Sequence, residues 1–312
     1  MTRILESTRR GTAGSLGCGV AAALALAVAL YGFPAFAQEI CPATPGELTT
    51  ALLNEDAAAR TEAAECFIEE AALFDYPDLK QVVNTMLRDE SPDVRFFGLL
   101  TLSASTWGGL TTGSDLRNEK AKIMQILNED PVPRNKAAAA AIIGAMDPIP
   151  MNQAEGPLLD LLAHSDTKVV NAALGALLSF DPPPEEQISQ ALMGMTAHSD
   201  QYHRSVALKG LGRLYRDDPS IDPAVIEALV LALSDDDRLV QWQAANSLWT
   251  FGPQASSAVP DLQAIVWDPK QPPEVRKVAQ EAVESITGEP IKPPWLTGET
   301  PPPEPGMAGA PE

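Results

Sequence analysis

The hydrophobic and polar positions of this chain recur in a fixed order at intervals of 34 to 39 residues. Seven anchor positions mark the repeat, and five of them are arginine: Arg60, Arg95, Arg134, Val170, Arg204, Gln241 and Arg276. Three residues after every anchor stands alanine or glycine, and seven residues after it stands an apolar residue. Offsets of three and seven place side chains on one face of a helix. Each anchor is therefore predicted to lie in a helix that buries this face.

The same alignment predicts where these helices begin. Four residues before the anchor, six of the seven repeats have an aspartate or a serine: Asp56, Ser91, Asp130, Asp166, Asp200, Asp237 and, in the seventh repeat, Pro272. Side chains of Asp and Ser cap helices because they accept hydrogen bonds from the first backbone N–H groups.

A second amphipathic segment precedes each of five caps. Its apolar residues keep helical spacing, as in Val82, Val83 and Met86 or in Ile226 and Leu229. Breakers such as Asp147-Pro148, Asp222-Pro223 and Gly252-Pro253 separate the units. Each unit is therefore predicted to be a helical hairpin, and the fold an all-α solenoid of about seven stacked hairpins, since one hairpin cannot bury its own apolar face.

The repeat resembles the HEAT family, and specifically the short repeats of phycobilisome-lyase-like proteins. The residues that carry the resemblance most fully are Ser91-Pro92-Asp93-Val94-Arg95 and Pro273-Glu274-Val275-Arg276-Lys277-Val278-Ala279. The resemblance covers residues 44–288 and implies an HEAT/armadillo-like superhelix; the family consists mostly of scaffolds, with a minority of lyases. Val170 and Gln241 depart from arginine at the anchor, which argues against an uninterrupted ladder of Asp and Arg between repeats.

The two ends of the chain differ from the repeats. Three arginines precede an apolar run over residues 20–33, and Ala35-Phe36-Ala37 supplies the small residues that a signal peptidase reads. We expect a signal peptide over residues 1–37, cleavage before Gln38, and a periplasmic or extracellular protein; an uncleaved anchor is the alternative. The solenoid is expected over residues 38–288. Residues 289–312, rich in Pro, Gly and Glu, are expected to be a disordered tail, unless Ile291 and Trp295 pin its start to the last hairpin.

Charge narrows the classes of partner. The chain has 22 basic and 42 acidic residues; without the three arginines and one glutamate of residues 1–37, 19 and 41 remain, a net charge of −22. Such a surface repels phosphate backbones and anionic lipid heads. We therefore expect no nucleic acid partner and no stable membrane insertion after signal cleavage.

Two cysteines remain after residue 37, Cys41 and Cys66. An even number of cysteines in an exported chain favours a disulfide between them. The alternative is two unrelated thiols, because Cys66 stands where the repeats bury a small residue.

The chain offers little for catalysis. It has three histidines, and residues 38–312 contain no HExxH, CxxC, GxSxG, Walker or dinucleotide-binding pattern. His198, Asp200 and His203 mix metal-ligand types, but Asp200 already serves as a cap, and the acids at Asp235-Asp236-Asp237 are explained by a helix start. We expect no catalysis, no cofactor and no metal.

One face of the second helices is the candidate binding surface. Positions one, five and eight after each anchor turn away from the predicted core, at about 100° per residue. From Phe96 to Trp249 this stripe contains no acid. We predict that it binds a protein or peptide partner through Phe96, Asn135, Asn171, Lys209, Trp242, Asn246 and Trp249. The alternative is that neighbouring hairpins or the tail cover these side chains.

Three functions remain open on the sequence. The first is an exported scaffold that holds a protein or peptide in its concave groove. The second, which rests on the family resemblance, is a lyase-like enzyme that acts on a chromophore or a protein side chain. The third is a structural spacer of the cell envelope.

Overall fold

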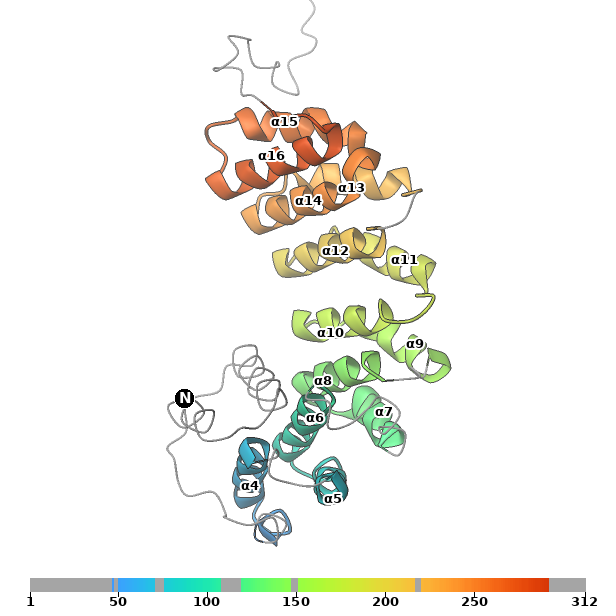
Figure 1. The fold of residues 1–312 in the computed structure, drawn as a ribbon, viewed down its shortest axis with the longest axis vertical. Coiled ribbons are helices and arrows are strands. Elements are labelled where there is room, and N and C mark those ends of the chain that lie inside the picture. Colours follow the sequence, from blue (N-terminus) through green and yellow to red (C-terminus); the bar gives the residue numbers. More distant parts are fainter. Residues whose placement is uncertain are drawn as a thin grey trace, which may run out of the picture. The chain divides into compact units, whose positions relative to one another are not determined.

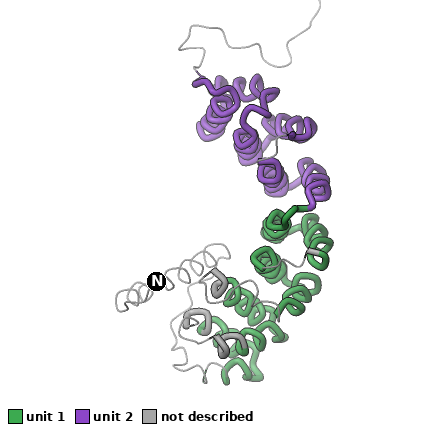
Figure 2. Tube along the Cα trace, turned by 45° about the vertical axis from the view of Figure 1, so that its right-hand side comes forward, with its two compact units in different colours: residues 1–183 green, residues 184–312 purple. Residues whose placement is uncertain are grey.

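The computed structural model describes residues 47, 50–70, 76–107, 119–146, 151–216 and 220–291. The expected signal peptide, Cys41 and most of the expected tail lie outside these residues. The described part is all helical and forms the expected α-solenoid of helical hairpins (Figure 1). The chain divides into two compact units, residues 1–183 and residues 184–312 (Figure 2).

Unit 1 contains an inner and an outer row of helices. The inner row consists of α4 (Ala57–Glu70), α6 (Pro92–Trp107), α8 (Pro133–Gly144) and α10 (Thr167–Leu177), each in contact with the next. The outer helices are α5 (Tyr76–Met86), α7 (Lys120–Glu129) and α9 (Met151–Leu161), which pack on α6, α8 and α10 respectively. The inner helices are those that begin just before the anchor positions of the repeat.

Unit 2 repeats this arrangement. Its inner row is α12 (Gln201–Leu214), α14 (Arg238–Phe251) and α16 (Pro273–Thr287), and its outer helices are α11 (Glu185–Met195), α13 (Pro223–Ala232) and α15 (Val259–Trp267). A 3-10 helix, η3 (Gly252–Ala258), joins α14 to α15 and was not predicted. It begins at Gly252, whose φ of 55° is a conformation that favours glycine, and at the predicted breaker Gly252-Pro253.

The columns read from the repeat form the core. The small residues three positions after the anchors, such as Ala173, Ala207 and Ala244, are fully buried. Among the apolar residues seven positions after the anchors, Leu177, Leu211 and Leu248 are fully buried as well. These small and large side chains alternate along the inner helices, so each unit has a continuous apolar core between its two rows.

The predicted caps hold in most hairpins. Asp166, Asp200 and Asp237 are the N-cap residues of α10, α12 and α14, and each carboxylate accepts the backbone N–H of the residue two positions on at 2.8 Å. Asp56 accepts the N–H of Ala58 at 3.0 Å in the same way, before α4. These hydrogen bonds satisfy donors that have no partner within the helix.

The predicted start of the inner helix in the third hairpin, α8, is wrong by two residues. Asp130 ends α7, and the N-cap of α8 is Val132, so the residue four positions after the cap is Lys136 and not Arg134. Ala139 and Ile143 then take the buried small and large positions, whereas Ala141, predicted to be in the core, is exposed. The sequence Asp130-Pro131-Val132-Pro133 offers two helix starts, because proline fits the first turn after either cap.

Arginine anchors tie three inner helices, α4, α6 and α12, to the loop of the next hairpin. Arg60 pairs with Asp89, Arg95 with Asp130 and Arg204 with Asp235, at 2.7–2.8 Å from each Nε to a carboxylate oxygen. Burial alone would raise the pKa of Asp130 and Asp235, but hydrogen bonds from the arginine and from a loop N–H outweigh it and lower both pKa values. The ladder is interrupted: Gln241 donates to the Asp235 carbonyl of its own hairpin, at 2.7 Å, and Val170 has no polar side-chain atom.

Candidate functional site

The candidate site in unit 2 is centred on α14. Trp242, Asn246 and Trp249 are four and three residues apart, which places them on one face of this helix. Trp249 is 46% exposed, and Trp242 and Asn246 are half-buried. The opposite face of α14, which includes Ala244, Ala245 and Leu248, is fully buried. The helix therefore presents two indoles and an amide outward because its other side supplies the core.

Small residues flank the indoles on the neighbouring helix α12. Ser205 and Gly212 hold the register positions of α12 that Trp242 and Trp249 hold on α14, and both are buried. Gly212 is needed for close packing, because a Cβ there would lie 2.6 Å from the Ser247 hydroxyl oxygen. The Ser247 hydroxyl donates to the Leu208 carbonyl at 2.9 Å and joins α14 to α12. At the register positions of the two indoles, α12 therefore carries no bulky side chain.

Charges at this face differ between its two flanks. On α12, Lys209 and Arg213 are exposed, lie one turn apart and form no ion pair within the described part of the chain. On α16, Lys277 pairs with Glu281 at 3.6 Å, and both side chains are more than half exposed. The surface thus runs from unpaired positive charge on α12, across the tryptophans of α14, to the Lys277–Glu281 ion pair and the half-buried Glu284 on α16.

Two of the seven predicted contact residues are core residues in this structure. Phe96 is fully buried, with the guanidinium of Arg134 4.6 Å from the centre of its ring. Asn135 is also fully buried; its amide nitrogen donates to the Pro92 carbonyl at 2.9 Å and to the Asp130 carboxylate at 3.1 Å. Neither side chain presents a surface to a partner. For Asn135 the reason is the shifted register of α8, which moves this residue from the outer face into the core.

The remaining predicted residues fall into both units. Asn171 is exposed on α10 of unit 1, where its amide donates to the Thr167 carbonyl of its own helix at 2.9 Å. Lys209, Trp242, Asn246 and Trp249 lie on adjacent helices of unit 2. The structure therefore brings four of the seven residues together. The position one residue after the anchor differs in burial between repeats: Ser205 and Phe96 are buried, whereas Trp242 is half-buried.

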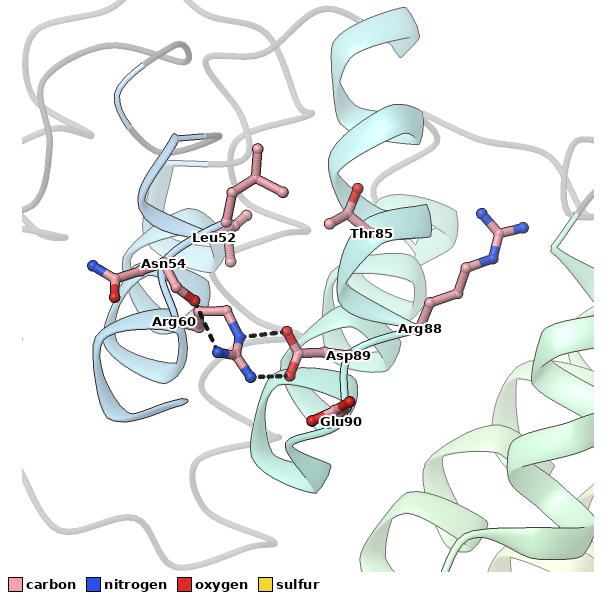
Figure 3. Close-up of a pocket in the computed structure, with 8 residues that line it drawn as sticks. Leu52, Asn54, Arg60, Thr85, Arg88, Asp89 and Glu90 are labelled. Atoms are coloured by element: carbon pink, nitrogen blue, oxygen red, sulfur yellow. Dashed lines mark hydrogen bonds and ion pairs between the residues drawn. The ribbon is translucent and has the colours of Figure 1, made fainter. Parts of the chain in front are cut away.

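A pocket in unit 1 is lined by polar side chains that bond to groups of the protein itself. It lies between the start of α4 and the end of α5 and is lined by Leu52, Leu53, Asn54, Arg60, Thr85, Arg88, Asp89 and Glu90 (Figure 3). Arg60 donates to both carboxylate oxygens of Asp89, at 2.7 and 2.9 Å, and to the Asn54 carbonyl at 2.8 Å. Its donors are thus occupied within the protein, and the hydrogen bonds raise the pKa of Arg60 further above its usual value.

Two further predictions concern the histidine cluster of unit 2 and Cys66 of unit 1. The rings of His198 and His203 stack at 4.2 Å, and His198 Nδ1 accepts the backbone N–H of Asp200 at 3.0 Å. Across the described residues, no three His, Cys, Asp or Glu side chains are placed to hold a metal ion. Cys66 is buried on α4. Its predicted partner Cys41 lies outside the described residues, so that pairing stays a prediction.

Sequence reasoning missed three exposed side chains in unit 2. Tyr202 and Leu239 are 56% and 38% exposed, each two residues after an aspartate cap. Leu231, on α13, is 77% exposed and lies outside the predicted stripe. The positions of Tyr202 and Leu239 could have been predicted from the repeat, since the residue two after a cap lies in the first helical turn.

No helix in the described ranges combines the length and the apolar character needed to cross a bilayer.

Comparisons with known proteins agree with the repeat. A family model described as HEAT repeats matches residues 188–284. No curated protein sequence matches the chain. Similar solved structures include the Escherichia coli protein YibA, at 15% identity and a TM-score of 0.51, covering 81% of this chain and 100% of that one.

Two further solved structures are similar at lower TM-scores. The complex of CpcE and CpcF of phycocyanin lyase from Nostoc sp. PCC7120 gives 17% identity and a TM-score of 0.43, over 82% of this chain and 98% of that one. An engineered protein gives 20% identity and a TM-score of 0.38, over 78% of this chain and 96% of that one. The family model thus identifies HEAT repeats over residues 188–284, and the described hairpins of both units show the stacked helical arrangement of such repeats.

Proposed function

We propose that this protein is an exported HEAT-repeat scaffold that binds a protein or peptide partner on the α14 face of unit 2, without catalysing a reaction. We call this surface the tryptophan face, and define it as Lys209, Trp242, Asn246 and Trp249. The observation that carries the proposal is the outward position of two indoles, one of them 46% exposed, on a helix whose other side is core.

The chemistry of the tryptophan face is that of an interface centre. Tryptophan is enriched among the residues that dominate binding energies, and interface centres are poor in acidic side chains. On a chain with 42 acidic residues, a face made of two indoles, an amide and one lysine departs from the average surface. An indole also combines a large apolar area with one N–H donor, which suits a partner that offers backbone carbonyl groups.

Export is supported by the leader and agrees with the predicted Cys41–Cys66 disulfide. Residues 1–37 have the charged start, apolar run and small residues of a secretory signal peptide. A disulfide between Cys41 and Cys66, the two cysteines after residue 37, would persist in an oxidising compartment, whereas disulfides are rare in the cytosol. We therefore place the scaffold in the periplasm or outside the cell.

Capture from the native envelope tests the proposal. The full chain is expressed in its source cell, crosslinked mildly and purified, and co-purified proteins are quantified by mass spectrometry. The test variant is Trp242→Ala/Trp249→Ala. The matched control is Leu231→Ala, which removes a large side chain that is 77% exposed on α13.

We expect at least one partner that the wild type and Leu231→Ala capture equally and that the double variant loses by at least about tenfold, since interface tryptophans each contribute about 2 kcal/mol or more. Recovery of the same partners in the same amounts by all three proteins would refute binding at the tryptophan face. A spectrum showing a covalently attached chromophore on the purified protein would instead support a lyase-like activity.

A further inference from the structure

The last described helix, α16, ends beside α14, which carries the tryptophans. α16 ends at Thr287, and Gly288 closes it with a φ of 74° and a backbone N–H bonded to the Glu284 carbonyl. Near this end the Ser285 hydroxyl donates to the backbone carbonyl of Trp249 at 3.2 Å. The described residues end at Ile291, so the 21 residues from 292 to 312 continue from a point six residues after this contact.

The composition of residues 292–312 suits an aromatic surface. Seven of the 21 residues are proline, in the runs Pro293-Pro294 and Pro301-Pro302-Pro303 and at 305 and 311. Proline-rich segments favour the extended polyproline II conformation, which loses little entropy on binding and docks on exposed aromatic rings. Between the two proline runs lie Trp295 and Leu296, which provide apolar side chains for the contact.

Charge also favours contact between residues 292–312 and the tryptophan face. Residues 292–312 contain three glutamates, Glu299, Glu304 and Glu312, and one lysine, Lys292, a net charge of −2. Beyond the tryptophans, the α12 flank offers Lys209 and Arg213, both exposed and without an ion pair in the described part of the chain. On a protein of net charge −20, an acidic segment that crosses Trp249 and Trp242 toward Lys209 approaches unpaired positive charge.

The segment is long enough to reach across the face. From Trp249 to Trp242 is seven residues, about 10 Å along a helix at 1.5 Å per residue. A polyproline II segment advances about 3.1 Å per residue, so a segment of eight residues, the length of 292–299, covers about 25 Å in that conformation. A short tether also gives an effective concentration of the order of 1 mM, at which a weak contact with a dissociation constant of about 0.1 mM is mostly closed.

We propose that residues 292–312 bind the tryptophan face of their own chain and compete there with the external partner. The occupant is thus an intramolecular, proline-rich acidic segment, and the tail regulates access to the site. The competition rests on the proposed function, whereas the intramolecular contact can be measured without any partner.

Proteolysis of the full chain tests the contact. A glutamate-specific endoprotease cuts the Glu299–Thr300 bond, and the rate is followed by mass spectrometry on the folded protein, with a free peptide of residues 289–312 as reference. A protease needs an extended, undocked segment, so binding slows the cut in proportion to the docked fraction. We expect the bond to be cut about tenfold more slowly in the wild type than in the peptide, in line with the effective concentration above.

Variants locate the contact. In Trp242→Ala/Trp249→Ala the cut is expected to approach the peptide rate, whereas Leu231→Ala is expected to keep the wild-type rate. Lys209→Glu, a change at an exposed position that leaves the core intact, is expected to speed the cut about threefold at low salt, and the exposed control Lys270→Glu to leave it unchanged. A wild-type cut at the peptide rate, or equal protection in the double variant, would overturn the proposal. Protection that rises with protein concentration would also overturn it, since the occupant would then be a second copy.

The chain shortened after Ile291 separates this proposal from the proposed function. If both hold, the shortened chain captures several times more partner than the full chain. If capture of the partner depends on the tryptophans but the tail is cut at the peptide rate, only the tail proposal is refuted. If the tail is protected from cutting but no partner depends on the tryptophans, only the proposed function is refuted.

Discussion

At the scale of single residues, Gly212 decides how closely α12 and α14 pack. A Cβ at this position would lie 2.6 Å from Ser247 Oγ and 2.8 Å from its Cβ, so the two helices would have to move apart. We expect Gly212→Ala to lower the free energy of unfolding by about 1–3 kcal/mol, the usual cost of overpacking a core. Urea unfolding followed by far-UV circular dichroism measures the change.

Gly194 provides the control in the same unit. It lies in α11, and a Cβ there would have no heavy atom within 4 Å, so Gly194→Ala gains helix propensity without a clash. This variant should be as stable as the wild type or more stable by up to about 1 kcal/mol. Equal effects of the two substitutions would mean that the close approach at Gly212 does not stabilise the interface.

At the scale of helices, Arg204 links α12 to two loops. Its Nη1 donates to the carbonyls of His198 and Ser199, at 2.9 and 3.1 Å, while Nε and Nη2 donate to the Asp235 carboxylate of the next hairpin, at 2.8 and 2.7 Å. Lysine keeps the charge but cannot make this planar set of bonds. Arg204→Lys is expected to cost about 1–3 kcal/mol in urea unfolding.

The matched substitution is Arg238→Lys, at the start of α14. Arg238 is 76% exposed and 3.9 Å from Glu274, an arrangement that contributes less than about 0.5 kcal/mol in most proteins. A loss in Arg204→Lys no larger than the loss in Arg238→Lys would contradict the role of Arg204 as a link between hairpins.

Elements that are fixed by local chemistry were predictable from the sequence. An aspartate that caps a helix, as Asp200 and Asp237 do, acts within two residues, so its role is visible in the spacing alone. The α8 register was not predictable in this way because Asp130 bonds to Arg95, 35 residues away, and leaves the cap to Val132. Such a long-range contact overrides a local signal that two prolines leave ambiguous.

The candidate site was predictable only in part for the same reason. Periodicity gives the face of a helix, and it correctly placed Trp242, Asn246 and Trp249 together on α14. It does not give the depth to which a face is covered, which depends on the neighbouring helices. Phe96 and Ser205 hold the same repeat position as Trp242 and are nevertheless buried. Exposure therefore had to come from packing and not from the repeat.

At the scale of the whole molecule, two opposing effects set the response to acid. With 42 acidic and 22 basic residues the chain repels itself at pH 7, and this repulsion weakens as the pH falls toward the isoelectric point near 4.5. The carboxylates of Asp130 and Asp235 act in the other direction, because their pKa values are lowered in the folded protein. Their contribution is fully present above the unfolded pKa of about 3.9 and is lost as the pH falls through the folded values.

We therefore expect the urea midpoint to change little or rise slightly from pH 7 to about pH 5, and to fall steeply below about pH 4, where the paired carboxylates take up protons only on unfolding. Asp130→Asn/Asp235→Asn should be less stable than the wild type at pH 7, and the difference should shrink as the pH falls below 4. Asp261→Asn, at an exposed position of α15, should follow the wild type throughout. A constant difference between the double variant and the wild type from pH 7 to pH 3 would show that the charge of these aspartates does not stabilise the stack, and that their uncharged hydrogen bonds are sufficient.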